Sequence, residues 1–429
     1  MTALIVIILL ALAAVGVPLF IIIGAGGLVA VWSAGLDPAV LMVEMMRLAS
    51  SPNLMAIPLF TLAGVVLSKG GAPERLIQLF KAGFGWMPGG LAIVVLTTCA
   101  FFTSLSGASG VTILALGGLL YPMLLQEGYS KRFSLGLVTS SGSLGLLFPP
   151  SIVVLMYGIV AGVNIEQMFK AGFVPGVVLL IMLALYSIFV GHKLKIKRYP
   201  FSWKVLRRAI RHGIWDLLLP IGIIVGLLGG YLTVTETATC TAAYAIFLEM
   251  VIHRDLNPIT QVPGFAKDRS LLEGIFREAS VLSGSLIIIL SMAMGLTNSM
   301  IDAQVPMKVL ALLEQDVHSK LEFLLLLNLF LLGVGFVMDI FSAIIVIVPL
   351  ILPVALRFGV DPVHLGIIFL ANLEIGYLHP PIGINLFLAS QRFKEPILKL
   401  FIAVIPFLLV MVVWLIMITY LPILSLWWK

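Results

Sequence analysis

Thr103-Ser104-Leu105-Ser106-Gly107-Ala108-Ser109-Gly110 interrupts a long apolar segment with small and hydroxyl-bearing residues. A second interruption of the same kind follows, Ser140-Ser141-Gly142-Ser143-Leu144-Gly145-Leu146-Leu147-Phe148-Pro149-Pro150-Ser151. The C-terminal half repeats the pair, first as Gly333-Val334-Gly335-Phe336-Val337-Met338-Asp339 and then as Gly376-Tyr377-Leu378-His379-Pro380-Pro381-Ile382-Gly383-Ile384-Asn385. Each half of the chain therefore carries two breaks in apolar sequence, and the rest is organised around them.

The spacing of the prolines indicates that the two halves are copies of one unit. Pro122 and Pro149 are 27 positions apart (149 − 122), as are Pro353 and Pro380 (380 − 353). A single shift of 231 residues (353 − 122) relates the two pairs. Paired breaks at corresponding places in two apolar halves point to the binding site of a transporter.

The composition predicts an all-α polytopic membrane protein. The chain has 429 residues, of which 61% are hydrophobic and 11% are charged. No soluble core of this size needs so much apolar surface. The formal charge of +6 could suggest nucleic-acid binding, but segment 192–212 holds a run of lysines and arginines and no acid. A concentrated basic loop of this kind marks the cytoplasmic side of a membrane protein, so no nucleic-acid partner is expected.

The repeat divides the chain into three parts. The N-terminal apolar run 3–34 predicts a first membrane helix in preference to a cleaved signal peptide. The expected parts are a first repeat over 1–191 (hairpin about 88–126, broken helix about 133–163), a basic cytoplasmic loop and linking helix over 192–232, and a second repeat over 233–429 (hairpin about 321–355, broken helix about 363–391).

The limbs on either side of Ser104–Gly110 are a little short for ordinary membrane spans. Each has about 16 residues, roughly 24 Å as a helix, against a hydrocarbon core of about 30 Å. Two short limbs that meet at a Gly/Ser tip predict a re-entrant helical hairpin. The alternative is a pair of thin ordinary spans.

The distribution of basic residues predicts that the two repeats are inverted. If 193–211 is cytoplasmic, tracing the spans backwards places Gln126–Arg132 inside. Tracing them forwards places Asp302–Lys320 outside, so the second hairpin enters the membrane from the opposite face.

The first repeat offers oxygen ligands for a cation. Ser106 and Ser109 supply hydroxyls at the hairpin tip. Gly145 and Phe148 should present free carbonyls, because the Pro-Pro pair that begins at Pro149 cannot donate and unwinds the preceding turn. Hydroxyls and carbonyls without formal charge suit Na⁺, a hard cation that prefers oxygen. The alternative is that these small residues serve close helix packing.

Acidic residues within apolar segments are further candidates. Asp339 stands in the second hairpin, where a carboxylate is costly unless it faces a cavity or a partner; the alternative is that it caps a helix. Glu374 and His379 flank the second break and could relay protons, although a lone His there can also be structural. Glu236 lies in a hydroxyl-rich helix and fits a hydrogen-bonding role equally well.

No motif for nucleotide hydrolysis or peptidase chemistry occurs in the sequence. It contains no GxxxxGK[ST] phosphate loop, no HExxH and no credible nucleophile elbow. The protein is therefore not expected to be an enzyme.

Several motifs, spread over nearly the whole chain, together resemble the large membrane subunit of a tripartite ATP-independent periplasmic (TRAP) transporter. They are Ala56-Ile57-Pro58-Leu59-Phe60-Thr61-Leu62-Ala63-Gly64, Ser106-Gly107-Ala108-Ser109, Phe148-Pro149-Pro150-Ser151-Ile152, Thr235-Glu236-Thr237-Ala238, Val348-Pro349-Leu350-Ile351-Leu352-Pro353 and Pro380-Pro381-Ile382-Gly383-Ile384-Asn385-Leu386-Phe387.

This resemblance implies an elevator-type transporter of the bacterial inner membrane, built from a scaffold and a moving transport domain. It implies coupling to Na⁺, with two or more ions. It also implies two partners, a small four-helix membrane subunit as a separate chain and a periplasmic substrate-binding protein. The implied substrate is a small organic acid, such as a C4-dicarboxylate or sialic acid.

The resemblance also assigns site residues by position. The implied Na⁺ ligands are Ser106, Ser109, Gly145, Phe148, Pro149, Gly335, Gly376 and His379, and the implied substrate contacts are Ser106, Ser151 and Asp339. Two positions depart from the family pattern. His379 stands where a small hydroxyl residue is expected, and Val234 where proline is expected.

Two other functions compete with a Na⁺-coupled importer. Proton coupling could run through Asp339, Glu374 and His379. Alternatively, the chain could be a membrane scaffold subunit that moves no substrate. Paired mid-membrane breaks favour transport, because a passive scaffold does not need them.

Overall fold

The computed structural model describes residues 19–429 apart from 34, 36, 40–41, 44, 47–49, 108, 197–199, 257–266, 303, 305–306, 309, 312–316 and 381–382; before residue 19 it describes 8, 11–12 and 17. The start of the first predicted span, Ala108 of the first tip and Pro381 of the second Pro-Pro pair therefore lie outside the described residues.

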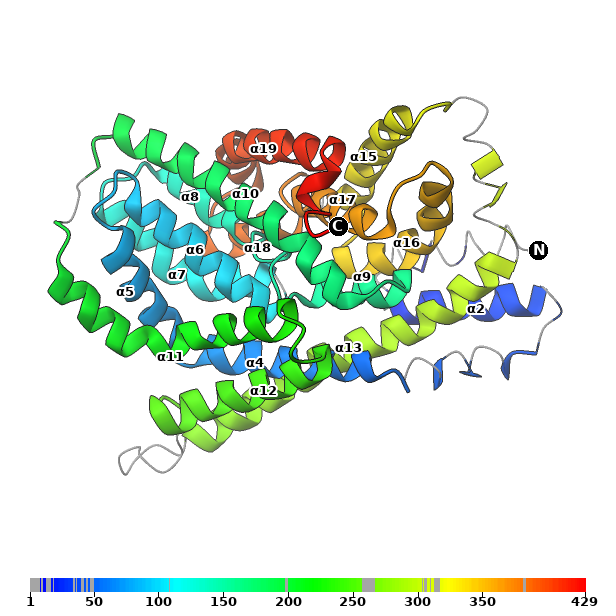
Figure 1. Ribbon diagram of the computed structural model, residues 1–429, viewed down its shortest axis with the longest axis horizontal. Helices are drawn as coiled ribbons and strands as arrows, with labels where there is room; N and C mark the ends of the chain where they lie inside the picture. The colour runs from blue at the N-terminus through cyan, green and yellow to red at the C-terminus, as the bar shows by residue number, and fades with distance from the viewer. Residues whose placement is uncertain are drawn as a thin grey trace.

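The described residues fold into an elongated assembly of helices (Figure 1). The α-helices are α2 (Leu19–Ser33), α4 (Ala56–Lys69), α5 (Ala72–Phe84), α6 (Gly90–Ser106), α7 (Ser109–Gln126), α8 (Lys131–Ser141), α9 (Ile152–Ala161), α10 (Ile165–Lys193), α11 (Trp203–Leu228), α12 (Val234–Phe247), α13 (Lys267–Asp302), α15 (Lys320–Val337), α16 (Ile340–Arg357), α17 (Pro362–Gly376), α18 (Ile384–Phe393) and α19 (Ile397–Tyr420). Short helices η1 (Pro52–Met55), η2 (Leu248–Ile252) and η3 (Pro422–Leu424) join them.

The helix bounds follow the shift seen in the sequence. Helices α6 to α10 begin 230 to 232 residues before α15 to α19, from (320 − 90) to (384 − 152). Local signals explain the agreement, because equivalent residues start equivalent helices. Ser130 accepts a hydrogen bond from the amide of Phe133 at the start of α8, and Asp361 accepts one from Val363 at the start of α17.

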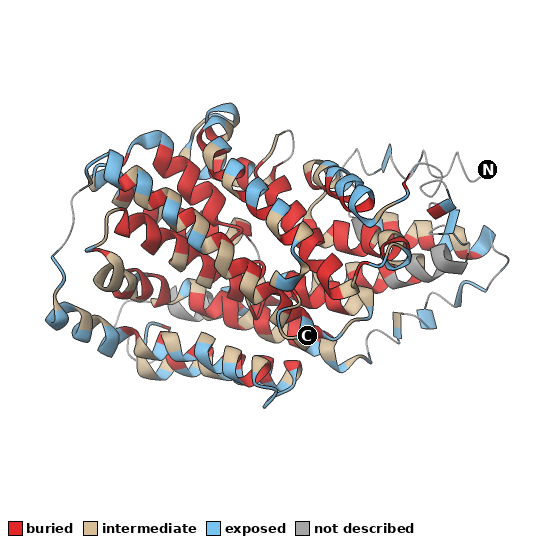
Figure 2. Cartoon of the chain, turned by 45° about the horizontal axis from the view of Figure 1, so that its top comes forward, coloured by how far each residue is buried: buried red, intermediate tan, exposed pale blue. Residues whose placement is uncertain are grey.

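The two halves pack through each other. Helix α7 lies against α18, and α16 lies against α9, so the second arm of each hairpin contacts the second part of the other half's broken helix. Within each half, α6 contacts α8 and α15 contacts α17. Figure 2 shows that buried residues concentrate in these central helices. A further group, α2, α4, α12 and α13, packs together along the lower edge of Figure 1.

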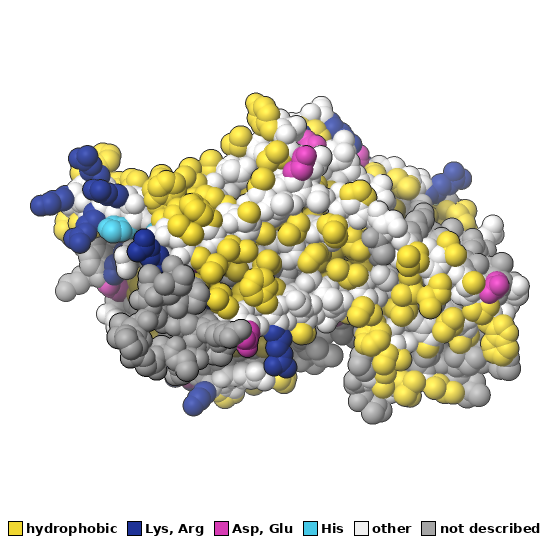
Figure 3. Space-filling view, turned by 90° about the horizontal axis from the view of Figure 1, so that it is seen from below, with side chains coloured by type: hydrophobic (Ala, Val, Ile, Leu, Met, Phe, Trp, Pro, Cys, Tyr) yellow, Lys and Arg dark blue, Asp and Glu magenta, His cyan; other side chains and the backbone are white. Residues whose placement is uncertain are grey.

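Seven helices among the described residues are long and apolar enough to cross a membrane: Pro52–Lys69, Ser109–Gln126, Ile165–Lys193, Trp203–Leu228, Leu272–Ala293, Ile340–Arg357 and Ile397–Tyr420. Their outer faces are apolar, as Leu185 and Phe189 of α10 and Leu409 and Val413 of α19 illustrate, since all four are exposed. Figure 3 shows hydrophobic side chains across the middle of one face and basic ones towards its ends. Such a surface fits contact with lipid.

Two charged segments are helical. Segment 69–81 contains most of α5, and segment 192–212, which begins the predicted basic loop, contains the start of α11. Both helices are amphipathic: α5 buries Leu76 and Leu79, while Lys204, Arg207, Arg208 and Arg211 of α11 are exposed. The two helices pack against each other, which gives their apolar faces a place that charge content alone does not reveal.

Candidate functional site

The first hairpin turns at Gly107, which has a positive φ of 65° and donates its amide to the carbonyl of Thr103 at 2.8 Å. A Cβ at this position would lie 2.8 Å from Cβ of Ile152, so glycine is required both by the turn and by the close approach. The tip therefore rests on the start of α9, directly after the first break and next to Ser151.

Ser109 joins the two halves of the protein. Its hydroxyl donates a 2.7 Å hydrogen bond to Oδ1 of Asn385, which is fully buried in the first turn of α18. The first hairpin tip is thereby fixed to the second broken helix. Sequence reasoning did not single out Asn385, although a lone amide at the start of an apolar helix, four residues after the Pro-Pro pair, was a usable signal.

Ser106 faces a different neighbour. It lines a small crevice together with Ser68 of α4 and Thr112 of α7. Helix α4 comes close at this point, since a Cβ on Gly64 would lie 2.6 Å from the carbonyl oxygen of Leu105. The two tip serines therefore do not converge on one point: Ser109 contacts the second half, and Ser106 contacts α4.

The first break lies against the first arm of its own hairpin. A Cβ on Gly145 would lie 2.2 Å from the carbonyl oxygen of Ala100 and 2.4 Å from the amide of Ser104. The carbonyl of Gly145 accepts from the amide of Phe148 at 3.1 Å, and that of Phe148 accepts from Ser151 at 3.0 Å. The two carbonyls, which the sequence predicts to be free, therefore each accept one hydrogen bond within a tight turn. Each carbonyl oxygen keeps a second lone pair that can bind a ligand.

The residues that follow the first break are enclosed. Phe148 packs edge-on against Phe173 with ring centroids 6.1 Å apart, and the Pro149–Pro150 peptide bond is cis. Ser151 is fully buried at the start of α9, and its hydroxyl has no hydrogen-bond partner among the described residues. It is therefore available to a ligand beside the first tip.

The second break repeats the contact of the first. A Cβ on Gly376 would lie 2.6 Å from Cα of Gly335, so α17 and α15 touch backbone to backbone. These two glycines occupy the positions of Gly145 and Ser104 in the first half (376 − 145 and 335 − 104, both 231). The structure thus brings two predicted Na⁺ ligands, Gly335 and Gly376, into direct contact.

Asp339 begins α16 and caps it. Its Oδ1 accepts from the amides of Phe341 at 3.0 Å and Ser342 at 3.1 Å, and its Oδ2 accepts from the Ser342 hydroxyl. The next amide, that of Ile340, donates to the Tyr377 hydroxyl at 2.9 Å, which ties the second tip to the second break. Asp339 therefore caps α16, as the alternative reading of the sequence predicts.

His379 is held between aromatic rings at the second break. It stacks on Phe336 at 4.2 Å and meets Phe401 edge-on at 5.2 Å, both measured between ring centroids. Its Nδ1 donates to the carbonyl of Pro380 at 2.6 Å. The ring thus fills the space where the family resemblance implies a small residue.

Glu374 is a buried carboxylate between the two breaks, and its negative charge needs compensation. It is fully buried, and neither of its oxygens has a hydrogen-bond partner among the described residues. The buried side chain of Ser143, its equivalent in the first half (374 − 143 = 231), faces it. A carboxylate in this setting is costly unless a cation or a proton accompanies it.

Glu236, by contrast, has a purely local role. Its Oε2 accepts from both the amide and the hydroxyl of Thr233 at 2.8 Å, which forms a capping box at the start of α12.

Both breaks and both tips therefore meet in one central region that is rich in hydroxyl, amide and carbonyl oxygens. It is held by the Ser109–Asn385 bond, the Gly335–Gly376 contact and the bond between Ile340 and Tyr377.

Comparison with known proteins gives the same picture of a transporter. The family model described as "Tripartite ATP-independent periplasmic transporter, DctM component" matches residues 6–424. The C4-dicarboxylate TRAP transporter large permease protein DctM of Vibrio cholerae is 32% identical over 99% of this chain and 96% of its own length. The isethionate TRAP transporter permease protein DctMQ of Oleidesulfovibrio alaskensis is 34% identical over 95% of this chain, which spans 63% of that relative.

A solved structure shares the fold. The YdaH transporter of Alcanivorax borkumensis, whose crystal structure was described as showing an unusual topology, superposes with a TM-score of 0.59 over 86% of each chain at 12% identity. This protein is therefore a multi-pass inner-membrane permease and not an enzyme, and it belongs to the DctM-component family of tripartite ATP-independent periplasmic transporters.

Proposed function

We propose that the protein imports a small organic acid, that Na⁺ drives this import, and that the substrate binds where the breaks and tips of the two repeats meet. The observation that carries the proposal is the buried carboxylate of Glu374, which lies between the breaks without a hydrogen-bond partner among the described residues. The side chain of Ser143, in the first break, faces it, so that the carboxylate and this hydroxyl together offer oxygens. A cation would complete this set of oxygens.

The substrate class is inferred from the relatives. Their names specify C4-dicarboxylates, isethionate and 2,3-diketo-L-gulonate, which are small organic anions, and also ectoine. We therefore place a C4-dicarboxylate first and keep sialic acid as a further candidate. Ser106, Ser151 and Asp339 are the proposed substrate contacts.

We also propose an elevator mechanism with two partner proteins. The grouping of α2, α4, α12 and α13 beside the intertwined hairpins and broken helices is what a scaffold and a transport domain require. A periplasmic substrate-binding protein would deliver the substrate. A small membrane subunit, as a separate chain, would be the second partner.

Uptake should depend on a Na⁺ gradient and on the tip serines. In proteoliposomes that contain the partner subunit and the binding protein, Ser106→Ala together with Ser109→Ala should reduce uptake at least about tenfold. With little change of volume, the pair of substitutions removes two proposed Na⁺ ligands and the hydrogen bond that holds the first tip to Asn385. Ser134→Ala is the matched control, since among the described residues that buried hydroxyl donates to the carbonyl of Ser130, the N-cap of its own helix. Full uptake driven by a proton gradient in Na⁺-free buffer would support proton coupling instead.

Asp339→Asn separates a capping role from a substrate contact. Asparagine caps a helix about as well as aspartate, so the variant should fold normally. If the carboxylate also binds substrate, loss of a charge-assisted bond worth about 1.5–3 kcal/mol should lower uptake roughly ten- to a hundredfold. Uptake is measured at matched levels of monodisperse protein. Uptake by Asp339→Asn equal to that of the wild type would show that Asp339 caps the helix and does not bind substrate.

A further inference from the structure

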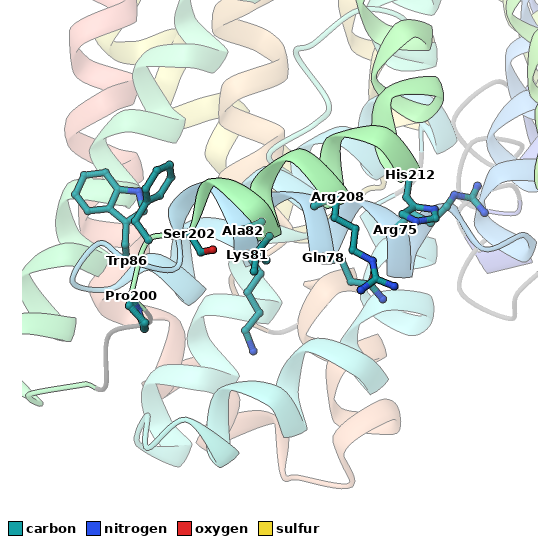
Figure 4. A pocket seen from close by; sticks show the side chains of 12 residues that line it. Arg75, Gln78, Lys81, Ala82, Trp86, Pro200, Ser202, Arg208 and His212 are labelled. Atoms are coloured by element: carbon teal, nitrogen blue, oxygen red, sulfur yellow. The ribbon is translucent and has the colours of Figure 1, made fainter.

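A pocket of about 730 Å³ lies between α5 and the first turns of α11, away from the two breaks. Figure 4 shows its lining, in which Lys81 and Arg208 extend towards the same side. His212 continues the basic lining along α11. The volume is within the range of pockets that bind small molecules, so the pocket can hold a ligand group of that size.

The charge of the pocket favours an anion. Arg75 at one end already bonds Asp216 and Glu249, so its charge is compensated. Lys81 lies 3.3 Å from Glu127. Arg208 is exposed, and no acid occurs between residues 192 and 215. Figure 3 shows the concentration of basic side chains at this end of the molecule.

The rim of the pocket at the start of α11 is aromatic. Trp86 meets Phe201 edge-on at 6.4 Å between ring centroids, and both side chains are about half exposed. Further along α11, Leu218, Ile221 and Val225 are exposed, as expected for a helix that enters the bilayer. Basic and aromatic residues at one end of an apolar helix are typical of the membrane interface.

We propose that this α5–α11 pocket binds the phosphate headgroup of an anionic membrane lipid at the cytoplasmic interface. Arg208, with His212 and Lys81, would contact the phosphate, and Trp86 and Phe201, on the side away from the apolar residues of α11, would cover the rest of the headgroup. The acyl chains would follow the apolar face of α11 into the bilayer. A soluble phosphate would use the basic residues but would gain nothing from the aromatic rings or from the apolar face of α11.

The test is native mass spectrometry of the full-length purified protein, titrated with phosphatidylglycerol or with phosphatidylcholine of the same acyl chains. We expect one phosphatidylglycerol to be retained and phosphatidylcholine to be lost. Arg208→Gln should weaken retention at least about tenfold, since a hydrogen bond between charged groups is removed. Arg211→Gln is the matched control, because this exposed arginine lies on the same helix but outside the pocket lining.

Trp86→Ala separates a lipid from a soluble anion. It should weaken phosphatidylglycerol binding, and inorganic phosphate at millimolar concentration should not displace the lipid. Equal losses in Arg208→Gln and Arg211→Gln would mean diffuse attraction and would overturn the site. Equal retention of phosphatidylcholine, displacement by inorganic phosphate, or occupation of the pocket by the partner membrane subunit would overturn the lipid assignment. Size-exclusion profiles of the variants identify any that fail to fold.

Discussion

Arg75→Met should be among the most destabilising single substitutions in this protein. The guanidinium bonds Asp216 at 2.9 Å and Glu249 at 2.5 Å, and it also pairs with Asp255. The side chains of Asp216 and Glu249 are only 1% and 0% exposed. Burial alone would lower the pKa of Arg75, but the hydrogen bond and the attraction of Asp216, together with Glu249, raise it above its ordinary value, so the side chain stays charged.

Methionine would leave these buried carboxylates facing each other without a cation. Breaking a buried ion pair from one side costs about 3–5 kcal/mol. The cluster also joins α5 to α11 and η2, so its loss should loosen the contact between these elements. We expect a clear drop in the thermal unfolding temperature of the detergent-solubilised protein and little monodisperse material on size exclusion.

Lys69→Met is the matched control for this prediction. Lys69 pairs with Glu278 at 3.1 Å, but the two side chains are 44% and 37% exposed, and a surface pair of this kind contributes at most about 1 kcal/mol. Adding Asp216→Asn and Glu249→Gln to Arg75→Met should recover part of the loss, because the unpaired charges disappear. Wild-type stability of Arg75→Met would show that the cluster does not hold these helices together.

Gly376→Ala should abolish most transport. The new methyl group would lie 2.6–2.8 Å from Cα, C and O of Gly335, and backbone cannot move aside as a flexible side chain can. Helices α15 and α17 would have to separate, which typically costs about 1–3 kcal/mol. The second tip would then move away from the second break, because Ile340 and Tyr377 are bonded across the same contact. We expect uptake to fall roughly tenfold or more, because a small displacement of the groups that position a substrate lowers the rate strongly.

Gly333→Ala provides the comparison on α15, the helix that carries Gly335. A Cβ there meets nothing within 4 Å, and alanine favours a helix over glycine by about 0.5–1 kcal/mol. This variant should therefore be as stable as the wild type or slightly more so, with unchanged uptake. Uptake of Gly376→Ala close to that of Gly333→Ala, at matched protein levels, would show that the Gly335–Gly376 contact does not position the site.

The sequence by itself determined where the helices around the two breaks start and stop. These boundaries depend on residues next to them: Gly107 allows the turn of the first tip, the Pro-Pro pairs prevent the helix from continuing, and Ser130 and Asp361 cap α8 and α17. Because such signals act over a few residues, the repeat and its 231-residue shift could be read from the chain alone, and so could the apolar class of the fold.

Only the tertiary structure decided which of these residues meet. Ser109 and Asn385 are 276 positions apart, and Arg75 is 174 positions from Glu249, so no local pattern could pair them. The amphipathic start of α11 falls in a segment that the sequence predicts as a basic loop, because a charged helix is recognised only when its apolar face has a partner. Which oxygen faces which cavity depends on how the two halves pack, and packing brings together residues that the sequence leaves far apart.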